Sequence, residues 1–269
     1  MNRIVVVTGA AGVLCEAIAE HFASLGDNVM LLDINEAKVL ELEKKLTDKG
    51  LKAKGYKANV LDKQNLIDVK NQIVKTFGVP DILINGAGGN NPRATTDIEF
   101  HGEGEGKNFF SLESEGVEFV FNLNFKGTFL TTQVFAEDMV NKKGANIINI
   151  SSMNAFSPLT KIPAYSAAKS AVSNFTEWLA VHFAKTGMRV NAIAPGFFAT
   201  NQNKTLLFNP DGSLTERSKK IIGKTPMGRF GEPKEILGTL SWLCDNEASG
   251  FITGVVIPID GGFNAYSGV

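Results

Sequence analysis

The chain has 269 residues, 43% of them hydrophobic, a size that suits one α/β domain around one large core. Its 27 basic and 28 acidic residues leave no charge excess for binding nucleic acid or an acidic membrane surface. We therefore expect a globular protein with no nucleic-acid partner and no membrane partner.

The cysteines and the first residues indicate a cytoplasmic protein. Cys15 and Cys244 lie far apart in apolar helical patterns, which is typical of reduced buried thiols. The histidines are scattered without zinc-ligand spacing, so we expect no metal. The opening residues lack the succession of charged region, apolar stretch and cleavage site that marks a signal peptide. No apolar run approaches the roughly 20 residues that span a bilayer.

Short β-branched runs alternate with longer amphipathic segments, which is the pattern of a parallel sheet with helices on both faces. In chain order, the predicted strands are 4–8, 29–33, 54–58, 82–85, 146–151, 189–193 and 255–259. The predicted helices are 14–25, 36–49, 64–77, 117–140, 164–185 and 234–245. The sequence thus predicts an α/β fold: one domain, residues 1–269, with a Rossmann-type doubly wound sheet of about seven parallel strands.

Two segments break this alternation. Residues 89–116 are rich in glycine, and residues 197–230 are polar with the turn Asn209-Pro210-Asp211-Gly212. They follow the fourth and sixth strands at the carboxyl ends, where open α/β sheets bind ligands. We interpret both as substrate-side loops, with plain surface insertions as the alternative.

Between the first strand and the first helix lies the turn Thr8-Gly9-Ala10-Ala11-Gly12, in which backbone N–H groups and a helix N-terminus can face a pyrophosphate. Asp33 ends the second strand, where a carboxylate can accept both ribose hydroxyls of an adenosine. Ile34 and Asn35 follow it, so no cation is at hand for a 2′-phosphate, which favours NAD over NADP. Alternatively, Asp33 is only an acid at the start of the next helix, although Asn35 can cap that helix too.

The chemistry depends on three side chains. Tyr165 and Lys169 stand four apart in a segment of helix formers and share one helical face. A nearby ammonium lowers the pKa of a phenol toward neutrality, as a general acid or base requires. Ser152 ends the fifth strand, and its hydroxyl can polarise the same substrate oxygen as the phenol. A Tyr–Lys pair alone is also compatible with an ordinary surface pair.

The sequence resembles the short-chain dehydrogenases/reductases over essentially the whole chain. The resemblance rests on the order and spacing of these residues together with Asn85-Gly86-Ala87-Gly88, Asn124, Pro195-Gly196 and Thr200. The resemblance implies that Ser152 orients the substrate oxygen and that Tyr165 exchanges its proton. Lys169 would bind the nicotinamide ribose and lower the tyrosine pKa. Asn124 would hold a water linked to Lys169, or else only tie its helix to the backbone.

The resemblance also implies a cofactor site with two departures from the family pattern. Val13 and Cys15 stand where glycines are usual, and Asn59 stands where an aspartate more often contacts adenine, so we expect an altered but retained cradle. The implied cofactor-binding residues are Thr8, Gly9, Ala11, Gly12, Val13, Leu14, Asp33, Asn59, Val60, Asn85, Ala87, Gly88, Tyr165, Lys169, Pro195, Gly196 and Thr200.

Within the family, the Gly88-Gly89-Asn90-Asn91-Pro92 turn, the long loop after it and the Gly12-Val13-Leu14-Cys15 variant resemble the sugar-acid branch of D-mannonate oxidoreductases, also called fructuronate reductases. A polyhydroxy acid needs hydrogen-bond partners and a cation for its carboxylate. We expect substrate contacts from Asn90, Arg93, Ser152, Asn154 and Asn201. Arg93 is the preferred carboxylate partner because of its planar fork, with an exposed surface arginine as the alternative.

Other functions stay open from the residues alone. They are a gluconate 5-dehydrogenase, another ketone reductase, a non-catalytic NAD-binding sensor, and a scaffold. The resemblance further implies a homotetramer built on the helices 117–140 and 164–185. The aromatic side chains there either lie outward and pair across that interface or face the core. They are Phe119, Phe121, Phe125, Phe129, Phe175, Trp178 and Phe183.

Overall fold

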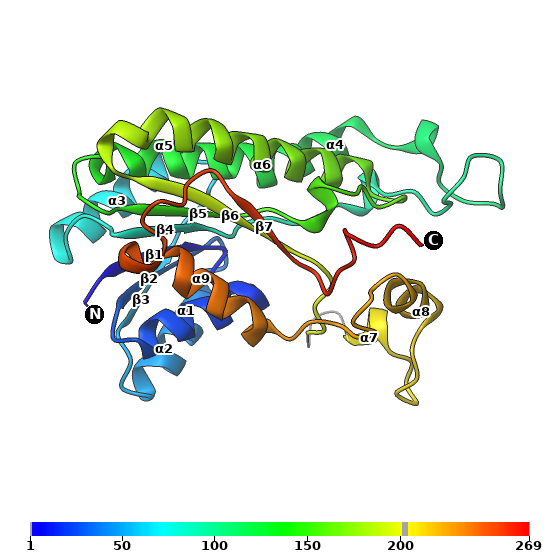
Figure 1. Cartoon of the computed structure of the whole chain (residues 1–269), viewed down its shortest axis with the longest axis horizontal. Coiled ribbons are helices and arrows are strands. Elements are labelled where there is room, and N and C mark those ends of the chain that lie inside the picture. Colours follow the sequence, from blue (N-terminus) through cyan, green and yellow to red (C-terminus); the bar gives the residue numbers. More distant parts are fainter. Residues whose placement is uncertain (1, 201–203, 269) are drawn as a thin grey trace.

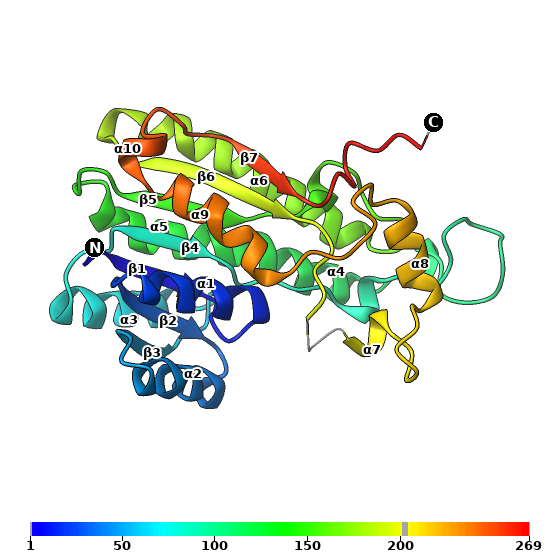
Figure 2. The same ribbon diagram turned by 60° about the horizontal axis from the view of Figure 1, so that its bottom comes forward.

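The computed structural model describes residues 2–200 and 204–268, and its centre is a seven-stranded parallel sheet (Figure 2). The strands are β1 (Ile4–Thr8), β2 (Asn28–Asp33), β3 (Ala53–Lys57), β4 (Ile82–Asn85), β5 (Asn146–Ile150), β6 (Arg189–Pro195) and β7 (Val256–Ile259). Their order is β3-β2-β1-β4-β5-β6-β7, with every neighbouring pair parallel. This is the predicted Rossmann-type doubly wound sheet; β1 and β4 have the predicted bounds, and the other strands differ from theirs by at most two residues at an end.

Helices cover both faces of the sheet, as predicted. They are α1 (Val13–Ser24), α2 (Glu36–Asp48), α3 (Lys63–Thr76), α4 (Ser114–Phe121), α5 (Gly127–Met139), α6 (Pro163–Phe183), α7 (Lys204–Leu207), α8 (Glu216–Gly223), α9 (Leu237–Leu243) and α10 (Asn246–Ser249). Figure 1 shows α1, α2 and α9 on one face and α3, α5 and α6 on the other. Within the described residues, no helix is long and apolar enough to span a bilayer.

The two faces of the sheet bury separate hydrophobic cores. Val5 and Val7 of β1 join the core beneath α1, α2 and α9, whereas Ile4 and Val6 join the core beneath α3, α5 and α6. This alternation follows from the two-residue period of a strand. All five residues of β1 are buried, because the strand has neighbours on both sides and helices above and below.

The predicted helix 117–140 is not continuous. A π-helical turn, η3 (Asn122–Lys126), separates α4 from α5, and Asn124 lies buried inside it. A π turn accommodates one extra residue and redirects a side chain, and such turns are frequent at functional sites. Asn124 hydrogen-bonds the backbone of Gly89 at this turn, so the helix is interrupted where a neighbouring loop approaches it.

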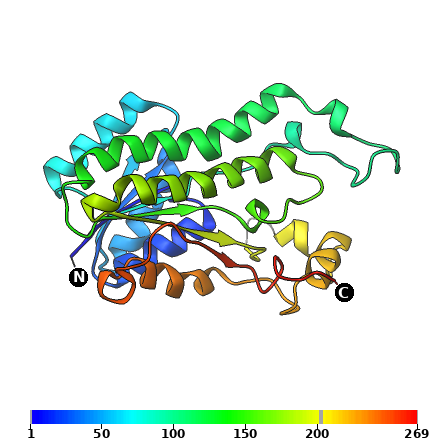
Figure 3. The same cartoon turned by 45° about the horizontal axis from the view of Figure 1, so that its top comes forward.

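The predicted loop 197–230 is also partly helical, because it contains α7 and α8. Thr215 caps α8 by accepting a hydrogen bond from the Ser218 N–H at 3.2 Å. The first segment, 89–116, holds only two short 3₁₀ turns and the start of α4. Both segments lie at the carboxyl end of the sheet (Figure 3), where a Lys220–Glu99 ion pair of 2.7 Å joins them.

Several aromatic side chains of η3, α5 and α6 touch one another on the outer side of these helices. Neighbouring ring centroids lie 4.7 to 6.4 Å apart in the aromatic cluster of Phe125, Phe129, Phe175, Trp178 and His182. Trp178 is 56% exposed and Phe129 38% exposed, whereas Phe175 also packs against the core. The predicted outward orientation therefore holds for part of this set.

Candidate active site

Two glycine turns pack directly against each other at the carboxyl ends of β1 and β4. Gly9 has φ +64°, and a Cβ there would lie 2.8 Å from the Ala87 Cα. The Thr8 hydroxyl accepts hydrogen bonds from the N–H groups of Gly86 (3.1 Å) and Ala87 (3.3 Å). Only glycine suits position 9, since the backbone is left-handed and the neighbouring turn leaves no space.

The N-terminus of α1 meets an acidic side chain beside this turn. Gly12 is the N-cap residue and supplies no side-chain cap, so first-turn N–H groups stay available to an anion. Asp33 accepts a hydrogen bond from the Ala11 N–H at 3.1 Å. Asn35, not Asp33, caps α2 by accepting from the Lys38 N–H at 3.1 Å. Asp33 also accepts from the Asn35 N–H at 2.9 Å, so it lies both beside the first turn and at the start of α2.

Cys15 fills the space where the two turns meet α1. The side chain is buried and free of any disulfide, and a Cβ on Gly86 would collide with its sulfur. Burial raises the pKa of the Cys15 thiol to about 12, so the sulfur stays a packed thiol. Its small side chain permits the close approach of helix and turn.

Tyr165 and Lys169 lie one turn apart near the start of α6, on the same face as predicted. The Lys169 Nζ is 5.7 Å from the centroid of the Tyr165 ring. Nζ also donates a 2.7 Å hydrogen bond to the Ile150 carbonyl at the end of β5. Strand and helix thereby fix the amine against the phenol ring.

The pKa shifts in this group differ from the predicted lowering for tyrosine. Burial raises the pKa of the Tyr165 phenol, and a hydrogen bond with Ser152 acts against that rise. Burial also lowers the pKa of Lys169 to about 8. The ammonium faces the ring and bonds a carbonyl, so desolvation outweighs its attraction for a phenolate.

Ser152 follows β5 and is buried next to this pair. Its Oγ accepts a hydrogen bond from the Asn154 N–H at 3.2 Å. The preceding Ser151 is engaged elsewhere, since its Oγ bonds the Lys169 carbonyl and the Ser173 hydroxyl. Ser152 is thus the serine whose hydroxyl interacts with Tyr165.

Asn124 connects η3 to the loop after β4. Its Nδ2 donates to the carbonyls of Gly89 (2.7 Å) and Val120 (2.8 Å), and its Oδ1 accepts from the Gly89 N–H (3.1 Å). A Cβ on Gly88 would lie 2.7 Å from that Oδ1 and 3.2 Å from the Lys169 Nζ. The tie to the backbone is therefore present beside Lys169, and a water-holding role for Asn124 stays a prediction.

Three other predicted cofactor residues, Asn85, Asn59 and Val60, lie at or just after the carboxyl ends of β4 and β3. Asn85 is buried, and its Nδ2 donates to Thr132 and Asn149, whereas its Oδ1 has no hydrogen-bond partner among the described residues. Asn59 is half-buried after β3, and its Oδ1 accepts from the Leu61 N–H at 3.0 Å. Val60 is buried against Gly127.

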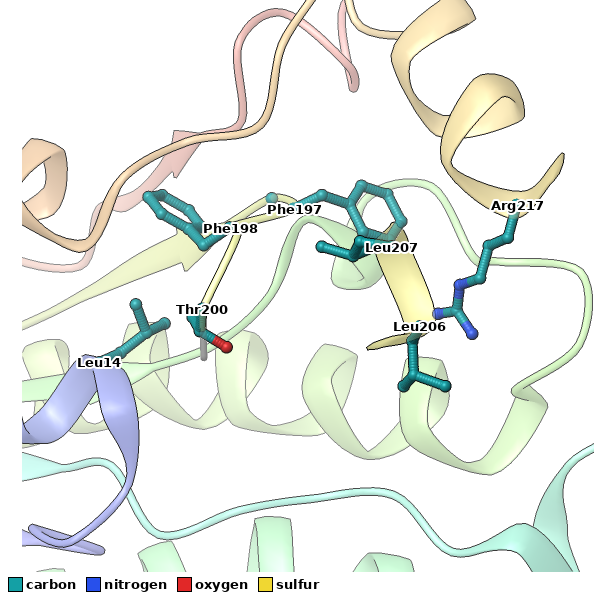
Figure 4. Close-up of a pocket in the computed structure, with 8 residues that line it drawn as sticks. Leu14, Phe197, Phe198, Thr200, Leu206, Leu207 and Arg217 are labelled. Atoms are coloured by element: carbon teal, nitrogen blue, oxygen red, sulfur yellow. The ribbon is translucent and has the colours of Figure 1, made fainter. Parts of the chain in front are cut away.

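A cavity of about 230 Å³ extends from the first turn to the second long segment (Figure 4). It is lined by Leu14, Gly196, Phe197, Phe198, Thr200, Leu206, Leu207 and Arg217. The predicted residues Leu14, Gly196 and Thr200 are therefore brought together. At the end of β6, next to Pro195, a Cβ on Gly196 would lie 2.6 Å from the Asp260 Cα, which explains the glycine there.

The predicted substrate residues do not gather into one set. Asn90 is exposed and donates to Thr95, whereas Arg93 pairs with Glu113 at 2.6 Å and Glu115 at 3.3 Å. Asn154 is buried beside Ser152, and its Oδ1 has no hydrogen-bond partner among the residues that the structure describes. Asn201 lies outside the described residues.

Sequence reasoning missed Arg217, which stands in α8 and lines the cavity. A basic residue within a short amphipathic stretch of the second segment is the signal that could have identified it. Among residues 2–200 and 204–268, no group of histidine, cysteine, aspartate and glutamate side chains could hold a metal ion.

The chain matches the family model described as short chain dehydrogenase over residues 3–209. It is 58% identical to an "uncharacterized oxidoreductase" of Haemophilus influenzae, covering 100% of this chain and 95% of that one. It is 52% identical to the "uncharacterized oxidoreductase UxuB" of Bacillus subtilis, covering 100% and 97%.

A solved structure from Haemophilus influenzae, provisionally named a D-mannonate oxidoreductase and holding NAD, is 57% identical. It superimposes with a TM-score of 0.96 over 100% of this chain and 97% of that chain. The turn after β1, the Tyr165–Lys169 pair and these similarities agree: the chain is an oxidoreductase that belongs to the short chain dehydrogenase family.

Proposed function

We propose that the protein uses NAD(H) to interconvert a ketone group of a sugar acid and the corresponding secondary alcohol, with D-fructuronate and D-mannonate as the pair. One observation carries the reaction type: the Lys169 amine is held against the Tyr165 ring, beside Ser152, at the carboxyl edge of the sheet. The similarity to the NAD-bound Haemophilus influenzae structure supports the cofactor and the substrate class.

The residues present fit a dinucleotide. The uncapped N-terminus of α1 and the left-handed Gly9 leave room and N–H donors for a diphosphate. The half-buried Asp33 carboxylate keeps lone pairs for ribose hydroxyls beyond the bonds it accepts from Ala11 and Asn35. In the bound state, the nicotinamide would accept or supply hydride, and Lys169 would contact its ribose.

The chain's own residues would manage the substrate oxygen and its proton. The hydroxyls of Ser152 and Tyr165 would both donate to that oxygen and so polarise the carbonyl. Because burial raises the Tyr165 pKa, the phenol keeps its proton at neutral pH and can give it to the developing alkoxide. The nearby Asn154 Oδ1 is a buried acceptor without a partner, which suits a hydroxyl of a sugar acid.

The test is a turnover assay with NADH or NADPH and four ketones: D-fructuronate, D-tagaturonate, 5-ketogluconate and a simple ketone. We expect D-fructuronate with NADH to react fastest. Tyr165→Phe should lower kcat by about 100-fold or more, because it removes the proton donor. The matched control Tyr56→Phe removes a hydroxyl on β3 and should keep wild-type turnover.

Binding of NADH, followed by fluorescence, should persist in Tyr165→Phe and so separate lost chemistry from lost cofactor. Wild-type turnover by Tyr165→Phe would refute the assignment of the proton donor. A wild-type protein that binds NADH and turns over no ketone would instead be a non-catalytic NAD-binding sensor.

A further inference from the structure

The arginines of the chain differ in what neutralises them. Three of them form ion pairs: Arg3 with Asp27 at 2.7 Å, Arg93 with Glu113 at 2.6 Å, and Arg229 with Glu235 at 2.7 Å. Arg189 donates hydrogen bonds to the Asn246 side chain and to the carbonyls of Leu243 and Ile252. Arg217 has no hydrogen bond or ion pair with any residue in 2–200 or 204–268. It is therefore the arginine whose fork remains available to a ligand.

Arg217 also lies where a substrate would enter. It lines the cavity that contains Thr200 and Gly196, and Figure 4 shows its guanidinium extending from α8 toward the side occupied by Leu206. The side chain is exposed as well as cavity-lining, so an entering anion reaches it without displacing a protein partner. Phe197, Leu206 and Leu207 border the same space, so Arg217 contributes a cation to a cavity whose other lining here is largely apolar.

The position of Arg217 is fixed by the attachments of α8. The Ser218 hydroxyl donates to the Leu207 carbonyl at 2.7 Å, which fastens α8 to α7. Lys220, three residues after Arg217, pairs with Glu99 of the first segment. The arginine is thus carried by a helix that is held from two sides, and a bidentate contact loses less freedom there than on an open loop.

We propose that Arg217 binds the carboxylate of the substrate and so selects sugar acids over neutral ketoses. This inference rests on the proposed function, and it replaces Arg93, whose fork already serves two glutamates. The planar guanidinium matches a carboxylate with two parallel hydrogen bonds. The competing anion is the cofactor diphosphate, which belongs beside Leu14 at the start of α1, across the cavity from Arg217 (Figure 4).

The test compares D-fructuronate with D-fructose, in which a hydroxymethyl group replaces the carboxylate. Arg217→Met keeps the apolar stem and should raise KM for D-fructuronate about 10- to 100-fold, the worth of a charge-assisted hydrogen bond. It should leave KM for NADH and kcat/KM for D-fructose unchanged. Arg217→Lys keeps the charge and loses the planar guanidinium, so its KM for D-fructuronate should lie between those of the wild type and Arg217→Met.

The matched control is Lys219→Met, which removes a positive charge two positions further along α8, where Lys219 pairs with Glu216. It should leave every constant near the wild-type value. An unchanged KM for D-fructuronate in Arg217→Met would overturn the inference while the proposed function stands. A raised KM for NADH would assign Arg217 to the diphosphate instead. If the wild-type protein reduces D-fructose as well as D-fructuronate, the proposed function and the inference both fail.

Discussion

Lys169 is a buried cation whose hydrogen bond goes to the Ile150 carbonyl and whose charge faces the ring of Tyr165. The four-residue spacing predicted the shared face, because that depends only on helix geometry. The direction of the tyrosine pKa could not be predicted, because it depends on how deeply β5 and α6 bury the group. The local sequence pattern thus predicted that Tyr165 and Lys169 share a face, whereas burial in the folded protein determines the direction of their pKa shifts.

The depressed pKa of Lys169 predicts a pH-dependent stability. Its pKa is 10.5 in the unfolded chain and about 8 in the folded protein, so between these values the unfolded state binds more protons. The contribution of Lys169 to the free energy of unfolding should therefore rise with pH across this window, by about 3 kcal/mol in all. Lys169→Met should remove this contribution, so the stability of the wild type relative to Lys169→Met should rise from pH 7 to pH 9.5 in urea denaturation. Burial raises the pKa of the Cys15 and Cys244 thiols, which lowers stability as the pH rises, but it does so in both proteins.

Two conditions sharpen this measurement. Lys75→Met, which removes an exposed lysine on α3, is the control for losing a solvated ammonium. The pH stays below 10, because the raised pKa of Tyr165 makes the folded state hold its proton longer there and lowers stability. A wild-type curve parallel to that of Lys169→Met would contradict the buried-cation assignment.

At the scale of elements, the strands were predictable and the interruptions of helices were not. Apolar runs between turn residues marked the strands, because a parallel sheet buries both faces of each strand. The η3 turn left no such mark: residues 117–140 keep helical periodicity, and the bulge depends on Asn124 reaching the Gly89 backbone. Likewise α8 spans only eight residues, so its amphipathic pattern is a weak signal within the polar segment around it.

The contact between α1 and the turn after β4 makes a prediction about Gly86. A methyl group there meets the Cys15 sulfur and lies 2.9 Å from the Thr8 carbonyl. Gly86→Ala should therefore lower the free energy of unfolding by about 1 to 3 kcal/mol. Adding Cys15→Ala should recover part of that loss, because it removes the sulfur and leaves the carbonyl.

The control is Gly238→Ala in α9, where an added Cβ meets nothing within 4 Å, and it should be neutral or stabilising. Chemical denaturation of the single and double variants gives the coupling energy. Strict additivity of Gly86→Ala and Cys15→Ala would show that the sulfur does not limit this position.

At the scale of the whole molecule, sheet order and the meeting of the two long segments follow from topology. Segments that leave the carboxyl ends of parallel strands must share one edge, which the sequence indicated. Which arginine is free there could not be seen, because the Arg93 partners stand 20 and 22 residues away and their closeness is a tertiary property. The sequence therefore indicated the location of the site better than its charges.

The aromatic cluster on the outer side of α5 and α6 predicts self-association. Exposed rings that already touch one another form an apolar patch that a second copy can cover. We expect a homotetramer, and Trp178→Glu combined with Phe129→Glu should lower the molar mass measured by light scattering after gel filtration. Leu40→Glu, on the exposed side of α2, should leave it unchanged. A wild-type monomer at micromolar concentration would contradict this expectation.

Asp33 has a second partner besides any ribose, because it also holds the Ala11 amide in place. A substitution of Asp33 that admits a phosphorylated coenzyme therefore also removes the acceptor of the Ala11 N–H. We expect that a companion substitution supplying a new acceptor for Ala11 would restore the order of the turn before α1. Descendants that have exchanged coenzyme should carry both changes together.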